Sequence, residues 1–172
     1  MAELLSILYI ALFAASGIGL SRYLFSREKP LVRIWLGLAL GMAMFIWFPA
    51  LFSFLLGFYL PAQLLGLLLA CLAGAAGFYF SRKKLLVASP WRVEVPFFIA
   101  GGILLTVCLV LLSTHTIVPR DGALYVGQST YGDLAMHLGF ISSIATQGTF
   151  PPMYCICPDM PVNYPFLCES VG

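Results

Sequence analysis

An acid and a histidine four residues apart are the residues in this chain whose types and spacing could do chemistry. They are Asp133 and His137, in the stretch YGDLAMHLGFISSIAT at residues 131–146. In a helix, at about 100° per residue, both would fall in one row with Phe140 and Ile144, beside an apolar stripe. A carboxylate held there is a candidate general base or metal ligand, because a base must lie within reach of the proton that it removes.

The same pair also has a purely structural interpretation. An acid in the first turn of a helix is stabilised by the helix dipole, and either Thr130 or Asp133 could cap the helix. His137 would then be the partner of Asp133 one turn later. Such spacings arise by chance as well, so spacing alone leaves both interpretations open.

The elements that must position this pair belong to a membrane protein. Of the 172 residues, 61% are hydrophobic and only 9% are charged, whereas soluble domains carry about 25% charged residues. Crossing the hydrocarbon core takes about 20 apolar residues in a helix. The sequence has four such segments, and it predicts transmembrane helices at about residues 4–20, 34–56, 61–80 and 96–113.

Prolines and glycines subdivide the apolar segments. The sequence GFYLPAQ, residues 57–63, marks a turn between the second and third helices. Pro49 should kink the second helix, and Pro96 should lie near the first turn of the fourth. The small residues in GLALGMA and LAGAAG permit close contact between helices.

The basic residues predict the orientation. Eight of the nine Lys and Arg residues fall in two short loops, residues 22–33 and 82–92. Both loops should be cytoplasmic by the positive-inside rule, and the two helices between them make that arrangement consistent. The N-terminus and residues 116–172 should then lie outside the plasma membrane.

We therefore predict an all-α, polytopic membrane protein. Residues 1–115 should form a four-helix transmembrane region, and residues 116–172 an external loop. Within that loop, an amphipathic helix at about residues 131–147 should lie in the membrane interface.

Other polar residues of the external loop are weaker candidates. Arg120 could contact a lipid phosphate, or form a solvated turn pair with Asp121. Glu169 would return to the membrane surface near Asp133 if the loop folds back, or it could be a solvated acid.

Three of the five cysteines, Cys155, Cys157 and Cys168, lie in the external loop. They could hold a disulfide from Cys168 to either of the others, or remain free thiols. A zinc site with His137 is disfavoured, because C-x-C is not the usual spacing of zinc ligands.

The order of motifs in the external loop resembles the first external loop of the GT-C membrane glycosyltransferases. These motifs are GDLAMHLGFI at 132–141, FPP at 150–152 and NYPFL at 163–167. The resemblance extends over residues 131–172 and covers no other part of the chain. It implies inverting transfer of a sugar from a polyprenyl-phosphate-linked donor to an acceptor at the outer face of a membrane, here expected to be a bacterial plasma membrane.

The resemblance also implies roles for individual residues. Asp133 matches the loop acid that binds or deprotonates the acceptor, and His137 matches a neighbouring polar position. Tyr164, with the proline that follows it, matches the element that ends the loop. We group His137, Tyr164, Glu169 and Arg120 as candidate substrate-binding residues. A divalent metal, Mg²⁺ or Mn²⁺, assists some branches of the family and is absent from others, so a metal at Asp133 stays open.

Family members have more helices than this chain, and three helices here precede the one that would match their first. The chain is therefore expected to be the N-terminal part of a longer enzyme, inactive by itself, whose partners are the bilayer, the lipid-linked donor and the remaining helices. No nucleic-acid partner is expected. The alternative is a non-enzymatic membrane protein, a transporter subunit or an assembly scaffold, whose tail binds a partner. The four helices have no charged residue at their centres, which argues against a pore but not against a scaffold.

Overall fold

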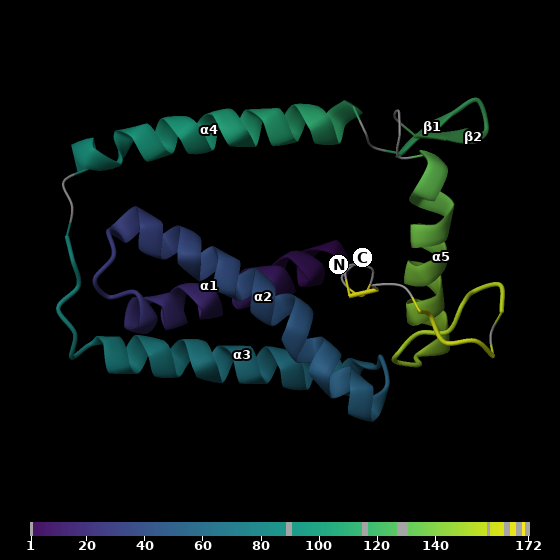
Figure 1. Ribbon diagram of the computed structural model, residues 1–172, viewed down its shortest axis with the longest axis horizontal. Helices are drawn as coiled ribbons and strands as arrows, with labels where there is room; N and C mark the ends of the chain where they lie inside the picture. The colour runs from purple at the N-terminus through teal and green to yellow at the C-terminus, as the bar shows by residue number, and fades with distance from the viewer. Residues whose placement is uncertain are drawn as a thin grey trace. The chain divides into compact units, whose positions relative to one another are not determined.

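The computed structural model shows four long helices, a small hairpin and a fifth helix (Figure 1). It describes residues 2–88, 91–114, 117–126, 131–157, 159–163, 166, 167 and 170. Four of the helices are long and apolar enough to cross a membrane, so the predicted all-α polytopic fold is confirmed. The chain divides into two compact units, one of Met1–Ser89 with Phe140–Gly172 and the other of Pro90–Gly139.

The first unit contains a bundle of three helices. These are α1 (Ala2–Leu24), α2 (Pro30–Leu56) and α3 (Leu60–Ser81), and each contacts the other two. α1 and α2 extend several residues beyond the apolar segments, because a helix can continue into the polar interface where hydropathy no longer marks it. α2 begins at Pro30, whose missing N–H costs nothing at the first helical position.

Glycines set the close approach of the three helices. A β-carbon added to Gly17 of α1 would overlap the Gly37 carbonyl oxygen and the Gly41 backbone nitrogen of α2. On the other side of α1, a β-carbon on Gly74 of α3 would lie 2.6 Å from the Cα of Ser16. Lipid tails are as apolar as leucine, so helix association in a membrane depends on such close packing.

An aromatic cluster fills the bundle near the middle of α1. Phe13 is 1% exposed, and its ring meets those of Tyr9 and Phe45 edge to face, at centroid distances of 5.2 and 5.4 Å. The ring centroids of Tyr9 and Phe45 are 5.8 Å apart. Edge-to-face pairing of this kind adds to the gain from apolar burial.

Pro49 lies inside α2, as the sequence predicts, and is buried. The Ser53 hydroxyl donates a hydrogen bond to the Pro49 carbonyl at 2.8 Å. A β-carbon on Gly66 of α3 would lie 2.6 Å from the Pro49 nitrogen. The part of α2 that lacks a backbone donor is therefore packed against a neighbouring helix, where a proline in a membrane helix is tolerated.

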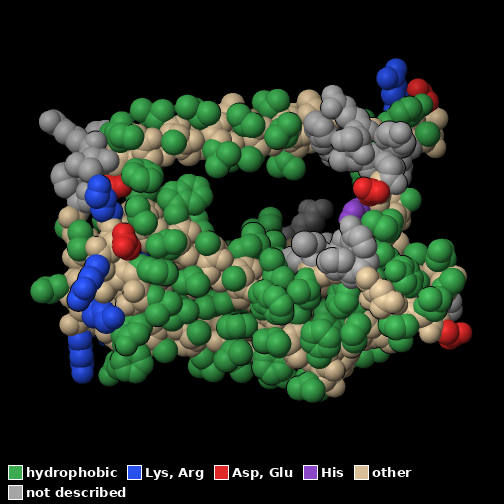
Figure 2. Space-filling view, in the orientation of Figure 1, with side chains coloured by type: hydrophobic (Ala, Val, Ile, Leu, Met, Phe, Trp, Pro, Cys, Tyr) green, Lys and Arg blue, Asp and Glu red, His purple; other side chains and the backbone are tan. Residues whose placement is uncertain are grey.

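Cations gather where α1 ends, α2 begins and α3 ends (Figure 2). The guanidinium groups of Arg22 and Arg82 lie over the Phe78 ring, at 5.0 and 5.3 Å from its centroid. The Lys84 ammonium donates to the Tyr23 carbonyl at 2.8 Å and lies 3.8 Å from the centre of the Tyr23 ring. Every Lys and Arg that the structure describes in this unit belongs to this basic end.

The second unit begins with α4 (Trp91–Thr114), whose large apolar side chains between Phe97 and Leu112 are exposed. Pro96 lies inside α4, and not in its first turn. That expectation was wrong because the helix begins upstream at Trp91, before the apolar segment starts. The missing N–H of Pro96 therefore removes a helical hydrogen bond from the carbonyl four residues earlier.

A hairpin follows α4, and the sequence analysis did not predict it. β1 (Ile117–Arg120) pairs antiparallel with β2 (Ala123–Val126). Asp121 and Gly122 form the two-residue turn, with φ of 50° and 76°. Positive φ at both turn positions matches the right-handed twist of the strands, and Asp-Gly is a strong signal for such a turn.

Candidate functional site

The acid–histidine pair lies on α5 (Tyr131–Gln147), which has the predicted bounds. Asp133 is exposed in the first turn of α5, where the helix dipole favours its negative charge. His137, one turn later, is half-buried. The same row continues to Phe140 and Ile144, each 2% exposed. Along this row the environment therefore changes from solvent to a packed core.

The side chains that α5 buries within the protein follow the row of Asp133 and His137. The apolar stripe beside that row, expected to lie in the membrane interface, is made of Leu134, Leu138, Ile141 and Ala145. In the structure Leu138 is 41% exposed, and the most buried side chains are Phe140, Ser143 and Ile144. The reason is the chain after α5: the Ser143 hydroxyl donates to the Met153 carbonyl, and the Phe140 and Tyr154 rings lie 5.8 Å apart.

Residues 148–163, which we call the FPP loop, fold back on themselves. The Tyr154 N–H donates to the Met160 carbonyl, and the Val162 N–H donates to the Pro152 carbonyl, both at 2.9 Å. Met153 and Pro161 form an antiparallel bridge between the two sides of the loop. The prolines of this segment therefore belong to a compact turn and not to an extended tail.

The FPP loop is anchored to the bundle where α2 ends and α3 begins. The Phe58 N–H donates to the Gly148 carbonyl at 2.7 Å. Phe150, only 8% exposed, meets Phe54 edge to face at 4.9 Å and stacks on Phe58 at 5.8 Å. Phe166 completes this cluster, 5.3 Å from Phe150. The first residue of the FPP motif is thus an aromatic anchor that holds the loop after α5 against the end of α2 and the turn that follows it.

Gly148→Ala should loosen this anchor. The φ of Gly148 is 65°, and an added β-carbon would run into the ring of Tyr59. We expect the free energy of unfolding to fall by about 2 kcal/mol, because the backbone strain adds to the smaller cost of rotating the Tyr59 ring, which is 56% exposed, out of the way. Denaturant titration in detergent micelles, with proteolysis of the loop as a second readout, measures the change.

Gly122→Ala is the matched control for Gly148→Ala. The φ of Gly122 is 76°, and nothing lies within 4 Å of the position of an added β-carbon. This variant should show the backbone cost alone, about 1 kcal/mol. Equal losses in the two variants would contradict a specific contact between Gly148 and Tyr59.

Of the remaining candidate residues in the external loop, the structure describes some and not others. Arg120 Nε lies 3.4 Å from an oxygen of Asp121, and the two side chains are 76% and 80% exposed. This is the geometry of a solvated turn pair. Tyr164, Glu169 and Cys168 lie outside the described residues. Cys155 and Cys157 are free, exposed thiols.

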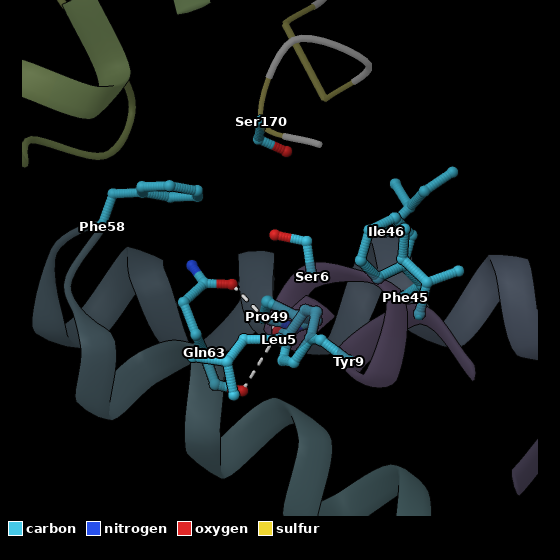
Figure 3. A pocket seen from close by; sticks show the side chains of 10 residues that line it. Leu5, Ser6, Tyr9, Phe45, Ile46, Pro49, Phe58, Gln63 and Ser170 are labelled. Carbon is cyan, nitrogen blue, oxygen red and sulfur yellow. Dashed lines mark hydrogen bonds between the residues drawn. The ribbon is translucent and has the colours of Figure 1, made fainter. Parts of the chain in front are cut away.

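A pocket of about 410 Å³ lies at the opposite end of the bundle from the basic end, and sequence reasoning missed it (Figure 3). Residues from the beginning of α1, the second half of α2 and the beginning of α3 line this pocket. Ser6, Tyr9, Gln63 and Ser170 supply its polar groups, while Phe45 and Phe58 supply aromatic walls. Polar side chains in otherwise apolar helices were the signal in the sequence.

No family model matches this chain, and neither the curated proteins nor the solved structures contain a match to it. Function therefore has to be argued from the residues and from their arrangement.

Proposed function

We propose that this chain is the N-terminal part of a membrane glycosyltransferase that uses a polyprenyl-phosphate-linked sugar donor, with Asp133 as the acceptor-side base. The observation that carries this function is the exposed carboxylate of Asp133 in the first turn of α5. The FPP motif supports it, because Phe150 anchors the chain after α5 to the end of α2 and to the turn between α2 and α3. A base carried by such a helix is suited to substrates whose lipid part lies in the bilayer.

The chemistry asked of Asp133 is a single proton transfer. The acceptor hydroxyl oxygen forms a bond to the anomeric carbon of the sugar, while the bond from that carbon to the donor phosphate oxygen breaks. Asp133 takes the hydroxyl proton, and polyprenyl phosphate leaves with the bonding electron pair. Attack from the face opposite to the phosphate inverts the anomeric centre. The ionised carboxylate is the form of Asp133 that accepts the proton in this role.

A divalent metal at Asp133 would need several further oxygen ligands. Among the described residues, no group of three His, Cys, Asp or Glu side chains could hold a metal ion. We therefore assign Asp133 the role of base and derive no step through Mg²⁺ or Mn²⁺.

The proposed function also requires an orientation. If the basic end of the bundle faces the cytoplasm, then the start of α1 and the anchored FPP loop face outward, as the positive-inside rule expects. The distribution of the described cations in the first unit supports this arrangement. We place the protein in a bacterial plasma membrane with residues 116–172 outside.

A membrane-impermeant maleimide should label Cys155 in intact spheroplasts. Cys155 is free and exposed in the FPP loop, so a variant that keeps it as the single cysteine reports the outer side. Lys83→Cys in a cysteine-free background is the counterpart at the exposed basic end, and it should react only after permeabilisation. The reverse pattern would show that the orientation is inverted.

Sugar transfer by the intact protein is the direct test of function. Proteoliposomes containing the protein as the cell makes it are supplied with radiolabelled polyprenyl-phosphate hexoses and extracts containing candidate acceptors. We expect label to move from the lipid donor to an acceptor with time. Folded protein that transfers no sugar from any donor of the panel would overturn the proposal and leave the scaffold function.

A further inference from the structure

Residues 82–88, which follow α3, fold back over the turn that follows α1. The Lys84 ammonium donates to the Tyr23 carbonyl at 2.8 Å, and the Val87 N–H donates to the Ser26 carbonyl at 3.3 Å. These two hydrogen bonds join the two basic loops of the sequence at one end of the bundle, where the cations gather (Figure 2). Positive side chains that are distant in the sequence therefore become neighbours.

Three arginines from three different segments lie at this junction. The guanidinium groups of Arg22 and Arg82 both lie over the Phe78 ring, 5.0 and 5.3 Å from its centroid. Arg33, in the first turn of α2, is 8% exposed, and it is close enough to Arg22 for the two positive charges to repel each other. We call Arg22, Arg33, Arg82 and Lys84 the cation cluster.

The cation cluster has no negative partner in the part of the chain that the structure describes. None of its four side chains forms an ion pair with a carboxylate among these residues. The hydrogen bond that Arg33 donates, to the Glu28 carbonyl at 3.4 Å, supplies a dipole and no full negative charge. Cations held together in partly desolvated surroundings are unfavourable without an anion. The cluster is therefore suited to a ligand that carries negative charge.

The surroundings of the cluster are those of a membrane interface. Arg82 and Lys84 are exposed, so an anion can reach their side chains. The Phe80 ring lies 6.1 Å from the ring of Tyr23 and 5.5 Å from that of Tyr79. Tyr79 and Phe80 are 61% and 56% exposed, and exposed tyrosines are enriched where the hydrocarbon meets the head groups. The anions found at that depth of a bilayer are the phosphates of lipids.

We propose that the cation cluster binds the phosphate of an anionic glycerophospholipid, such as phosphatidylglycerol, in the leaflet at the basic end of the bundle. The guanidinium of Arg82 donates paired hydrogen bonds to two phosphate oxygens. The Lys84 ammonium has three donors, so it can contact the phosphate as well as the Tyr23 carbonyl. Arg22 and Arg33 add positive charge nearby. The site does not depend on the proposed sugar transfer, because Asp133 is not part of it.

Native mass spectrometry of the intact protein in a non-ionic detergent tests this site. Phosphatidylglycerol and phosphatidylcholine with the same acyl chains are titrated separately, and the intensities of the free and lipid-bound protein give a Kd for each lipid. We expect phosphatidylglycerol to bind at least about tenfold more tightly, because its head group is negative and that of phosphatidylcholine has no net charge.

Arg82→Gln removes one positive charge from the cluster at an exposed position. We expect this variant to weaken the binding of phosphatidylglycerol about fivefold, the contribution of one cation near a membrane surface, and to leave the binding of phosphatidylcholine unchanged. Melting of the same sample checks that the variant is folded. If it is not, Lys84→Gln takes its place, with the same expected loss.

Lys83→Gln is the matched control for Arg82→Gln, because it removes the same charge from the next residue. Lys83 is also exposed, and its side chain has no hydrogen bond, ion pair or ring contact with any described residue. We expect this variant to bind phosphatidylglycerol within about twofold of the unsubstituted protein.

The outcomes separate a lipid site from general charge attraction. Equal affinity for the two lipids would overturn the site, and so would equal losses in Arg82→Gln and Lys83→Gln, which would mean that only the net charge matters. Displacement of phosphatidylglycerol by inorganic phosphate at constant ionic strength would overturn it as a lipid site. A preference for phosphatidylglycerol that Arg82→Gln reduces and Lys83→Gln retains supports it.

Discussion

Asp133→Asn should lower sugar transfer by the intact protein at least about 100-fold, the smaller end of what a general base contributes. Asparagine has nearly the same shape as aspartate but accepts no proton from the acceptor hydroxyl. Because Asp133 is exposed at the start of α5, the change should cost less than about 1 kcal/mol of stability through the helix dipole. The loss should therefore appear in kcat and not in the amount of folded protein. Initial rates with a radiolabelled donor in proteoliposomes, together with melting of the same samples, measure both effects.

Asp121→Asn is the matched control for Asp133→Asn. Asp121 is a second exposed acid, 80% exposed in its side chain, at the turn of the hairpin. Its φ of 50° is a conformation that asparagine accepts, so the substitution should not disturb the backbone. We expect transfer by Asp121→Asn to stay within about twofold of the unsubstituted protein. If both variants retain full transfer, the catalytic role of Asp133 is wrong.

Gly17→Ala should lower the free energy of unfolding of the bundle by about 3 kcal/mol, at the upper end of what overpacking costs. The added β-carbon would overlap backbone atoms of Gly37 and Gly41, which cannot rotate away as a side chain could. α1 and α2 must therefore separate, and contacts along the whole interface weaken together. Denaturant titration in mixed micelles measures the loss.

Gly102→Ala is the control for Gly17→Ala, because both replace a helical glycine by alanine in a membrane span. Nothing lies within 4 Å of a β-carbon at Gly102 in α4. We expect no loss, and a gain of up to about 1 kcal/mol from the higher helix propensity of alanine. A similar loss in both variants would mean that glycine packing does not hold the bundle together.

Several elements of the fold could be predicted because their signals are local. A helix was expected at about residues 131–147, where α5 runs from Tyr131 to Gln147, since helical periodicity and the polar residues that flank it lie in one short stretch. The turn after α2 was predicted from Gly57 and the proline that follows it, and Gly57 indeed adopts a φ of 75°. The glycines in GLALGMA and LAGAAG indicated close helix contact, and Gly37, Gly41 and Gly74 are where it occurs.

Other features could not be predicted because they depend on partners distant in the sequence. The buried face of α5 is chosen by the FPP loop, through Ser143 and Phe140, and not by the most hydrophobic stripe of the helix. Phe150 looked like part of a turn motif, yet it packs on Phe54 and Phe58 nearly a hundred residues earlier. The hairpin is a different case, because its signal, the Asp121–Gly122 turn, is local to the sequence.

The sequence by itself identified four segments that, among the described residues, form helices long and apolar enough to cross a membrane, and it identified the helix that carries Asp133. Hydropathy and helical periodicity are sums over neighbouring residues, so they need no knowledge of the fold. Only the tertiary structure decided that Gln63 and Tyr9, 54 residues apart, share a hydrogen bond at a pocket. Which glycine meets which backbone, and which donor is left unpaired, depends on how the helices are aligned against one another. That alignment is set by packing over the whole interface, and no single segment encodes it.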